Sequence, residues 1–183
     1  MFERMITSWK SYCIDENFVG IGSTRKAYRA FDYVIKVNIH PIGYKQSQNE
    51  MKIYHSMVKK GFNALFAETY YVDSFISIQK YYAPLELKNN QSYEINVKKH
   101  HHLLPESFEQ ALDILDKEFD CFDLHDSSNY GLNENGKLVF TDYGMTKGLY
   151  ENEWVPLAEK GILPQIYFDV CTSCGVEKEL RIY

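Results

Sequence analysis

The sequence predicts an α+β fold, in which an antiparallel sheet and a helix precede a smaller, mainly helical part. Short apolar runs separated by turn residues dominate the first 84 residues, which is typical of antiparallel strands. One helical period interrupts these runs at 44–60, and another begins at Pro105. A chain of 183 residues is long enough for one domain, or for one domain with two small lobes.

The first half is expected to contain two helices and five strands. Apolar positions 2, 5, 6, 9, 12 and 13 predict a helix over 2–13. Three strands follow, at about 17–22, 27–31 and 33–38. Pro41-Ile-Gly43 is expected to break the chain before a helix from about Tyr44 to Lys60. The runs 69–72 and 75–82 predict a hairpin that turns at Asp73-Ser74.

The second half carries weaker signals. Alternation of Tyr93, Ile95 and Val97 allows a strand. Pro105 begins a helix, with an apolar face made of Phe108, Ala111, Leu112 and Leu115. A hairpin is predicted with strands at 130–132 and 138–140, closed by residues 133–136, and Gln165–Val170 favours a further strand.

Acidic and amide side chains in the second half match the chemistry that phosphoryl transfer requires. Asp123 and Asn129 lie in one loop, and Asp142 follows the strand expected before it. One acid can take the proton of an attacking hydroxyl group. The amide and the other acid can hold the magnesium ion that neutralises phosphates.

Lys36 and Glu50 are predicted to form a buried ion pair. Lys36 lies within an apolar strand, where an unpaired ammonium group is costly. Glu50 belongs to the inward helical stripe 50, 53, 54, 57 and 58. The alternatives are an edge strand whose lysine reaches water and a glutamate that does the same.

Two glycines, Gly20 and Gly22, lie in an apolar strand before a polar turn. Glycine lets backbone N–H groups approach phosphate oxygens closely. The same pattern also marks a bulge or a tight hairpin, and both interpretations stay open.

In their order and spacing, these motifs make the chain resemble the protein-kinase-like superfamily, and most of all small kinase-like proteins encoded by bacteriophages. The motifs are Gly20-Ile-Gly22, Val34-Ile-Lys36-Val37, Glu50, Phe122-Asp-Leu-His125, Asn129 and Thr141-Asp-Tyr-Gly144. The resemblance implies a two-lobed kinase-like fold. An N-lobe with its N-terminal helix would cover 1–84, and a truncated C-lobe with the catalytic and metal-binding loops would cover 85–183.

The resemblance also implies a role for each matched residue. Lys36 would contact the α- and β-phosphates of ATP, and Glu50 would orient Lys36. Asp123 would be the catalytic base, and Asn129 and Asp142 would ligate Mg²⁺. His125 would touch the γ-phosphate, with a structural histidine as the alternative. The remaining contacts to ATP would come from Gly20, Gly22, Ser23 and Thr24 over the phosphates and from the hinge 81–85, with Tyr82, at the adenine. Ile35, Ile78 and Leu132 would line the adenine pocket or pack in the core.

The chain departs from the family pattern at three places. Arg25 stands where the third glycine of the phosphate loop would fall. Asn129 follows Asp123 by six positions, where the family has five. Either the loop carries one extra residue, which the following hairpin favours, or Ser128 takes the amide position. Few residues follow Asp142, and no Ala-Pro-Glu motif is among them, so much of the helical C-lobe is expected to be missing.

These observations predict an ATP- and magnesium-dependent kinase that phosphorylates a hydroxyl group of a host protein, in phage takeover of the host or evasion of its defence. The alternative is a catalytically weak pseudokinase that binds and inhibits a partner protein, because the C-lobe is short and the catalytic loop is altered. The second alternative is a small-molecule phosphotransferase, which the position of His125 favours.

Composition limits the partners. A net charge of −5 argues against nucleic acid, and the basic run Lys98–His102 is interpreted as a solvated loop. No signal peptide is recognised, and no apolar run approaches the ~20 residues of a membrane span. The chain is therefore expected to be soluble and cytoplasmic, in the host cytoplasm if it is phage-encoded.

The four cysteines are expected to be thiols in that compartment. Cys171 and Cys174 form half of a zinc site, which would need two further ligands. Plain reduced cysteines are the favoured interpretation of this pair, and a zinc ion is the alternative.

Overall fold

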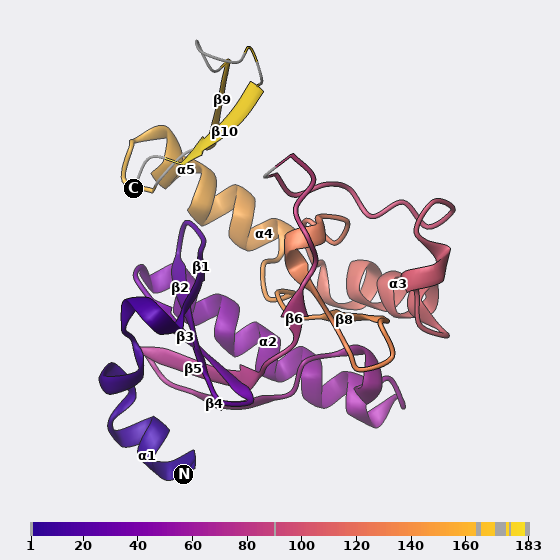
Figure 1. Cartoon of the computed structure of the whole chain (residues 1–183), viewed down its shortest axis with the longest axis horizontal. Helices are drawn as coiled ribbons and strands as arrows, with labels where there is room; N and C mark the ends of the chain where they lie inside the picture. Colours follow the sequence, from indigo (N-terminus) through magenta and orange to yellow (C-terminus); the bar gives the residue numbers. More distant parts are fainter. Residues whose placement is uncertain (1, 90, 164–165, 171–174, 176, 182–183) are drawn as a thin grey trace.

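The computed structural model describes residues 2–89, 91–163, 166–170, 175 and 177–181. The fold is mixed α+β, with antiparallel sheets and several helices (Figure 1), which confirms the fold class at that level. None of the helices in the described part of the chain combines the length and the apolar character that crossing a membrane requires.

A five-stranded antiparallel sheet organises the first half. Its strands are ordered β1-β2-β3-β5-β4 and comprise β1 Phe18–Ile21, β2 Arg25–Ala30, β3 Tyr33–Asn38, β4 Thr69–Val72 and β5 Ile76–Lys80. The three predicted strands and the predicted hairpin are thus confirmed. In the β2–β3 pair Ala27 lies opposite Lys36 and Arg25 lies opposite Asn38, so Arg25 and Lys36 share one face of the sheet.

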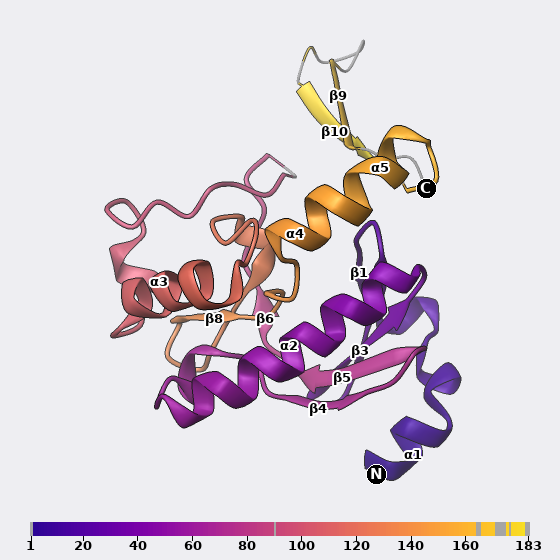
Figure 2. The ribbon, with the colours of Figure 1, turned by 180° about the vertical axis from the view of Figure 1, so that it is seen from behind.

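Helix α2, Pro41–Lys59, packs on that face of the sheet (Figure 2). The predicted break at Pro41 is wrong, because the helix begins there. Proline fits a first helical turn, whose N–H groups need no intrahelical partner. The side chain of His40 accepts a hydrogen bond from the Ile42 N–H and so caps the helix. Gly61, with a positive φ, follows its end.

The opposite face of the sheet is covered by the N-terminal segment. Helix α1, Phe2–Thr7, is shorter than the predicted 2–13, and a 3-10 turn, Trp9–Tyr12, completes the segment. Met5 packs there against Ile35 and Ile78, and all three are fully buried. These two isoleucines are therefore core residues and do not line the Lys36 side of the sheet.

The second half contains a small sheet, β6-β7-β8, and helix α3. The strands are β6 Ala83–Pro84, β7 Tyr130–Leu132 and β8 Leu138–Phe140, and the predicted 130–140 hairpin is confirmed. Helix α3, Phe108–Phe119, starts three residues after Pro105 and buries Phe108, Ala111 and Leu115. No strand forms at 93–97, where Ile95 instead donates its N–H to His125 O at 2.7 Å. Shorter 3-10 turns lie at Asp15–Asn17, Asn63–Leu65, His101–Leu103 and Ser127–Asn129.

The chain then forms one helical segment, residues 147–159, made of α4 Lys147–Leu149, a π-helical turn Tyr150–Trp154 and α5 Val155–Glu159. A hairpin of β9 Ile166–Val170 and β10 Glu177–Arg181 follows and extends away from the rest of the molecule (Figure 1). The strand predicted at 165–170 is confirmed apart from Gln165, which lies outside the described residues. Cys171 and Cys174 also lie outside them, so the zinc alternative stays a prediction.

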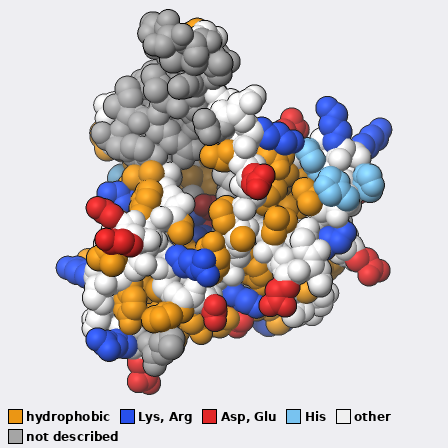
Figure 3. Space-filling view, viewed as in Figure 1, with side chains coloured by type: hydrophobic (Ala, Val, Ile, Leu, Met, Phe, Trp, Pro, Cys, Tyr) orange, Lys and Arg blue, Asp and Glu red, His pale blue; other side chains and the backbone are white. Residues whose placement is uncertain are grey.

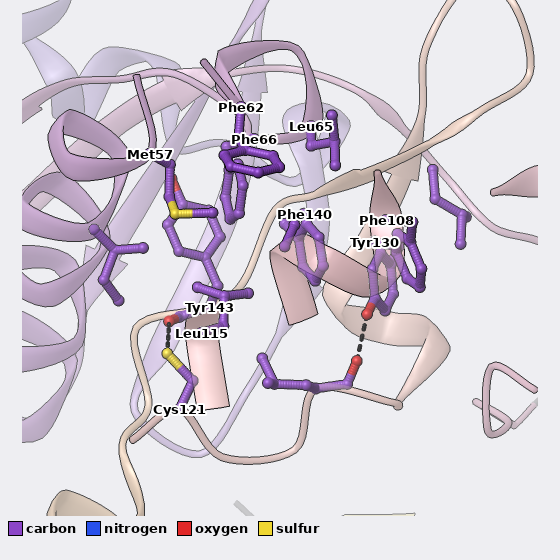
Figure 4. Packing of buried hydrophobic residues seen from close by; sticks show 14 of the residues in the cluster. Met57, Phe62, Leu65, Phe66, Phe108, Leu115, Cys121, Tyr130, Phe140 and Tyr143 are labelled. Carbon is purple, nitrogen blue, oxygen red and sulfur yellow. Dashed lines mark hydrogen bonds between the residues drawn. The ribbon is translucent and has the colours of Figure 1, made fainter. Parts of the chain in front are cut away.

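The largest hydrophobic cluster joins both halves of the chain. Ile53 and Met57 of α2 pack with residues of β7, β8 and α3. At its centre the rings of Phe66 and Phe140 stack with centroids 4.9 Å apart (Figure 4). A continuous core therefore contains residues from both sides of the boundary predicted at residue 84. The division into two lobes stays a prediction.

Gly144 is expected to be indispensable where the two halves meet. A Cβ atom at this position would lie 2.1 Å from the Gln46 carbonyl oxygen and 2.8 Å from Glu50 Cγ, so Gly144→Ala must displace the backbone of α2. We expect a loss of about 1–3 kcal/mol in the free energy of unfolding, as for other overpacked sites. Chemical denaturation measures this loss.

Gly148→Ala is the matched control for that change. Its Cβ would meet nothing closer than 3.9 Å, and alanine favours a helix. Equal stability of the two variants would contradict the close approach at Gly144.

Candidate functional site

The predicted pair of Lys36 and Glu50 is confirmed. The ammonium nitrogen Nζ of Lys36 lies 3.0 Å and 3.1 Å from the two carboxylate oxygens of Glu50. Glu50 is fully buried and Lys36 is 7% exposed, so neither side chain reaches water as the alternatives required. Lys36 also donates a hydrogen bond of 2.6 Å to the Thr141 carbonyl oxygen, which ties the sheet to the residue before Asp142.

Arg25 completes this site, and sequence reasoning missed it. Its Nη2 atom lies 2.9 Å from Glu50 Oε1 and 2.7 Å from Asp142 Oδ1. Its Nη1 atom donates to Ser47 Oγ at 3.2 Å. We call Arg25, Lys36, Glu50 and Asp142 the charge cluster; it joins β2, β3, α2 and the segment after β8.

Burial and ion pairing act against each other on the pKa values of Arg25, Asp142 and Lys36. Burial opposes the charge of Arg25, but Asp142 and Glu50 outweigh it and raise the pKa of the guanidinium. Burial acts against ionised Asp142 as well, yet Arg25 and Lys36 lower the pKa of its carboxyl group. For Lys36, burial together with the nearby Arg25 lowers the pKa, although Glu50 counteracts them.

Asp123, Asn129 and Asp142 meet through one hydrogen-bond network. Asn129 donates its side-chain amide to the Asp123 carbonyl oxygen at 2.6 Å. The carbonyl oxygen of Asn129 accepts the backbone N–H groups of Thr141 and Asp142, at 2.9 and 3.2 Å. Ser128 is exposed and contacts Asp126 through its N–H. Asn129, rather than Ser128, thus connects Asp123 with Asp142. This is the arrangement expected if the loop after Asp123 carries one extra residue.

Asp123 is an exposed residue in a left-handed backbone conformation, with φ of 60°. Desolvation of its carboxyl group, together with the carboxylates of Asp126 and Asp142, raises its pKa to about 6. A carboxylate with this pKa is a stronger base than an ordinary aspartate and is still ionised at neutral pH. These properties suit a general base.

Two surface cavities meet at Asp123 and His125. One, of about 460 Å³, is lined by residues 91–94 and Asp126; the other, of about 560 Å³, lies against α3. His125 is exposed, and its Nδ1 atom lies 3.4 Å from the Ile95 carbonyl oxygen. Its predicted contact with a γ-phosphate stays a prediction.

The predicted phosphate-covering turn, Gly20–Thr24, joins β1 and β2 directly before Arg25. The N–H of Gly22 donates to the Arg25 carbonyl oxygen at 2.8 Å and closes the turn. Thr24 is buried, and its hydroxyl group donates to the side chain of Gln46 in α2. The turn is thereby tied to α2 at the residue directly before Arg25.

The helical segment 147–159 reaches that turn from the other half of the chain. Trp154 Nε1 donates to Ser23 Oγ at 2.8 Å. The rings of Phe122, Tyr150 and Trp154 form a continuous stack, with centroids 4.1 and 5.1 Å apart. The stack connects the loop that carries Asp123 with the glycine turn. Tyr150 and Trp154 are four residues apart, a helical spacing that could have indicated this element.

The predicted hinge, 81–85, contains strand β6. Gly131 lies so close to Tyr82 that a Cβ atom at Gly131 would be 2.5 Å from Tyr82 Cβ. The ring of Tyr82 is half-buried, with Lys80 Nζ 5.4 Å from its centroid. Leu132 packs against the edge of the largest core. Adenine binding by Tyr82 and Leu132 stays a prediction.

Arg25 competes with a metal ion for one of the two predicted magnesium ligands. One oxygen of Asp142 already binds Arg25. Asn129 donates its side-chain N–H to Asp123, but a metal would bind the side-chain oxygen of Asn129, so this bond does not oppose ligation. The charges of Arg25 and Lys36 balance those of Glu50 and Asp142, which leaves no surplus negative charge for a divalent cation. Ligation by Asn129 and Asp142 stays a prediction, and Arg25 would compete with the metal for Asp142.

The chain matches no protein-family model, no curated protein and no solved structure.

Proposed function

We propose that this chain is a kinase-like phosphotransferase that uses ATP to phosphorylate a hydroxyl group of a protein. The observation that carries the proposal is the buried Lys36–Glu50 pair, joined through Thr141 and Asn129 to an exposed Asp123 whose pKa is raised. A two-lobed kinase-like arrangement, with ATP between the five-stranded sheet and the loops after α3, follows from the same reading.

In the proposed reaction, the hydroxyl oxygen of the substrate attacks the γ-phosphorus of ATP. The bond between the γ-phosphorus and the β–γ bridging oxygen breaks, ADP leaves, and the hydroxyl proton passes to the carboxylate of Asp123. Lys36 holds the phosphates, and Glu50 fixes the position of Lys36. The backbone of the Gly20–Thr24 turn covers the phosphates from above.

The exposure of Asp123 between two surface cavities favours a protein as the phosphate acceptor. An enclosed pocket would suit a small molecule better. A host protein, with a phage-encoded kinase acting in takeover or anti-defence, is the acceptor that the sequence resemblance suggests.

The test is transfer of label from γ-labelled ATP. The purified chain, assayed both with magnesium and with EDTA, is expected to label itself or proteins of a bacterial lysate, and the label is expected to be stable as a phosphoester. Absence of label in both conditions, from folded protein, would contradict the proposal.

The Arg25–Asp142 ion pair favours a second candidate function, a pseudokinase that binds and inhibits a partner protein. An arginine on the acid that phosphoryl transfer needs would slow or prevent turnover. In that case no label is transferred, and a partner remains bound after Asp142→Ala.

A further inference from the structure

Arg25 is a fixed positive charge inside the candidate site. Its side chain is only 6% exposed, and both terminal nitrogens are engaged, with Ser47, Glu50 and Asp142. A surface arginine that happened to reach an acid would keep much of its freedom, whereas this guanidinium is held by two carboxylates and a hydroxyl group.

Arg25 lies at the end of β2 next to the predicted phosphate-covering turn. It is the first residue of β2, directly after the Gly20–Thr24 turn, and it shares a sheet face with Lys36. An anion beneath the turn would therefore lie near two cations. The side chain of Asp142 is 41% exposed, so the cluster is open to solvent on the side where Arg25 is paired.

The charge balance separates this cluster from a metal site. Arg25 and Lys36 balance Glu50 and Asp142 as they stand. Without Arg25 the remaining three groups would carry one net negative charge, and Asp142 would be free to bind a divalent cation. With Arg25 in place, a metal competes with a charge-assisted hydrogen bond of 2.7 Å for the Asp142 carboxylate.

We propose that the guanidinium of Arg25 takes the electrostatic role of a divalent metal beside Asp142, so that the site binds a nucleoside triphosphate without metal. The inference rests on the proposed function, since it assumes that phosphates enter beneath the glycine turn. The planar guanidinium suits this role because it can exchange a carboxylate for a phosphate and bind both with paired N–H groups.

The experiment is titration of the full chain with ATP by calorimetry, in EDTA and again in excess magnesium chloride. The two dissociation constants are expected to agree within about threefold, and Arg25→Met is expected to weaken binding in EDTA by about tenfold or more, as loss of a charge-assisted contact does. Lys52→Met is the matched control, because it removes one positive charge from an exposed position on α2 and is expected to leave both constants unchanged.

Asp142→Asn provides a second test at a partly exposed side chain, where folding is less at risk. If Arg25 replaces the metal, this variant releases the guanidinium from one of its two carboxylates and keeps or tightens ATP binding in EDTA. A metal-dependent site would instead lose ATP binding in magnesium chloride when Asp142 loses its charge.

The outcomes separate the two proposals. Binding of ATP in magnesium but not in EDTA would overturn the role of Arg25 and leave the proposed function standing. Absence of binding in both media, with protein that is folded by circular dichroism, would overturn both.

Discussion

Asp123→Asn is expected to reduce phosphoryl transfer by roughly 10²–10⁴-fold, the usual contribution of a general base. Asparagine keeps the shape of the side chain but cannot take the proton of the attacking hydroxyl group. It also tolerates the left-handed backbone conformation, φ of 60°, that Asp123 adopts. ATP binding is expected to be unchanged, so labelled transfer and calorimetry on one preparation separate chemistry from binding.

Asp120→Asn is the matched control, since Asp120 is also exposed and left-handed, with φ of 54°. It is expected to keep most of the transfer rate. Equal losses in the two variants would show that the loop, and not the carboxylate of Asp123, limits the reaction.

The pH profile gives an independent measure of the same group. The base acts as its carboxylate, and its pKa is raised to about 6. Transfer by the unaltered chain is therefore expected to be half-maximal near pH 6, to fall at lower pH and to level off above pH 7. In Asp123→Asn this inflection is expected to disappear from the residual rate. A profile that stayed flat down to pH 5 would argue against Asp123 as the base.

Glu50→Ala is expected to have the largest effect on stability. The change leaves the buried cations of Lys36 and Arg25 with one fewer carboxylate, and Lys36 loses the carboxylate whose two oxygens lie 3.0 and 3.1 Å from its ammonium nitrogen. Breaking one member of a buried ion-pair network costs roughly 3–5 kcal/mol. Urea denaturation followed by circular dichroism measures the change in the free energy of unfolding.

Glu118→Ala is the comparison that isolates burial. The ion pair of Glu118 with Lys60 has the same length as the Arg25–Glu50 pair, 2.9 Å. Both side chains of the Glu118–Lys60 pair, however, are about one third to one half exposed. Its loss is expected to cost less than about 1 kcal/mol. Similar costs for the two variants would mean that the charge cluster contributes no more than an ordinary surface pair.

Much of this site could be predicted from local patterns. The helical stripe that contains Glu50 and the apolar strand that contains Lys36 each indicate a buried charge, and two buried charges of opposite sign need each other. The predicted pair is confirmed for that reason. Asp123, Asn129 and Asp142 could be found because they follow one another along the chain in the order of the kinase motifs. Asn129 connects the two acids, as expected for a loop with one extra residue.

Arg25 was missed because it was considered only as a missing glycine. The hairpin of β2 and β3 contained the signal. Its turn at Phe31-Asp32 pairs Ala30 with Tyr33, and counting back along both strands places Arg25 on the face of Lys36. An arginine on the buried face of a strand needs an acid, and Glu50 was already assigned to that face.

The helical segment 147–159 carries only a weak local signal, the four-residue spacing of Tyr150 and Trp154. It contains a π-helical turn and Pro156, and Tyr150 and Trp154 are partly buried by contacts with Phe122 and Ser23, far away in the sequence. Helical periodicity in a sequence detects only helices that have a continuous apolar face. The predicted break at Pro41 is wrong because proline is well suited to the first position of a helix, where α2 begins.

One stripe of α2 carries both Glu50 and two residues of the largest core, Ile53 and Met57. A rotation of this helix about its axis would withdraw the carboxylate from both cations and, in the same movement, pull two side chains out of close packing. Neither half of that movement is favourable alone, because packed interiors do not deform gradually. Any switching of this molecule through α2 should therefore occur between two discrete states, without a graded series of positions between them.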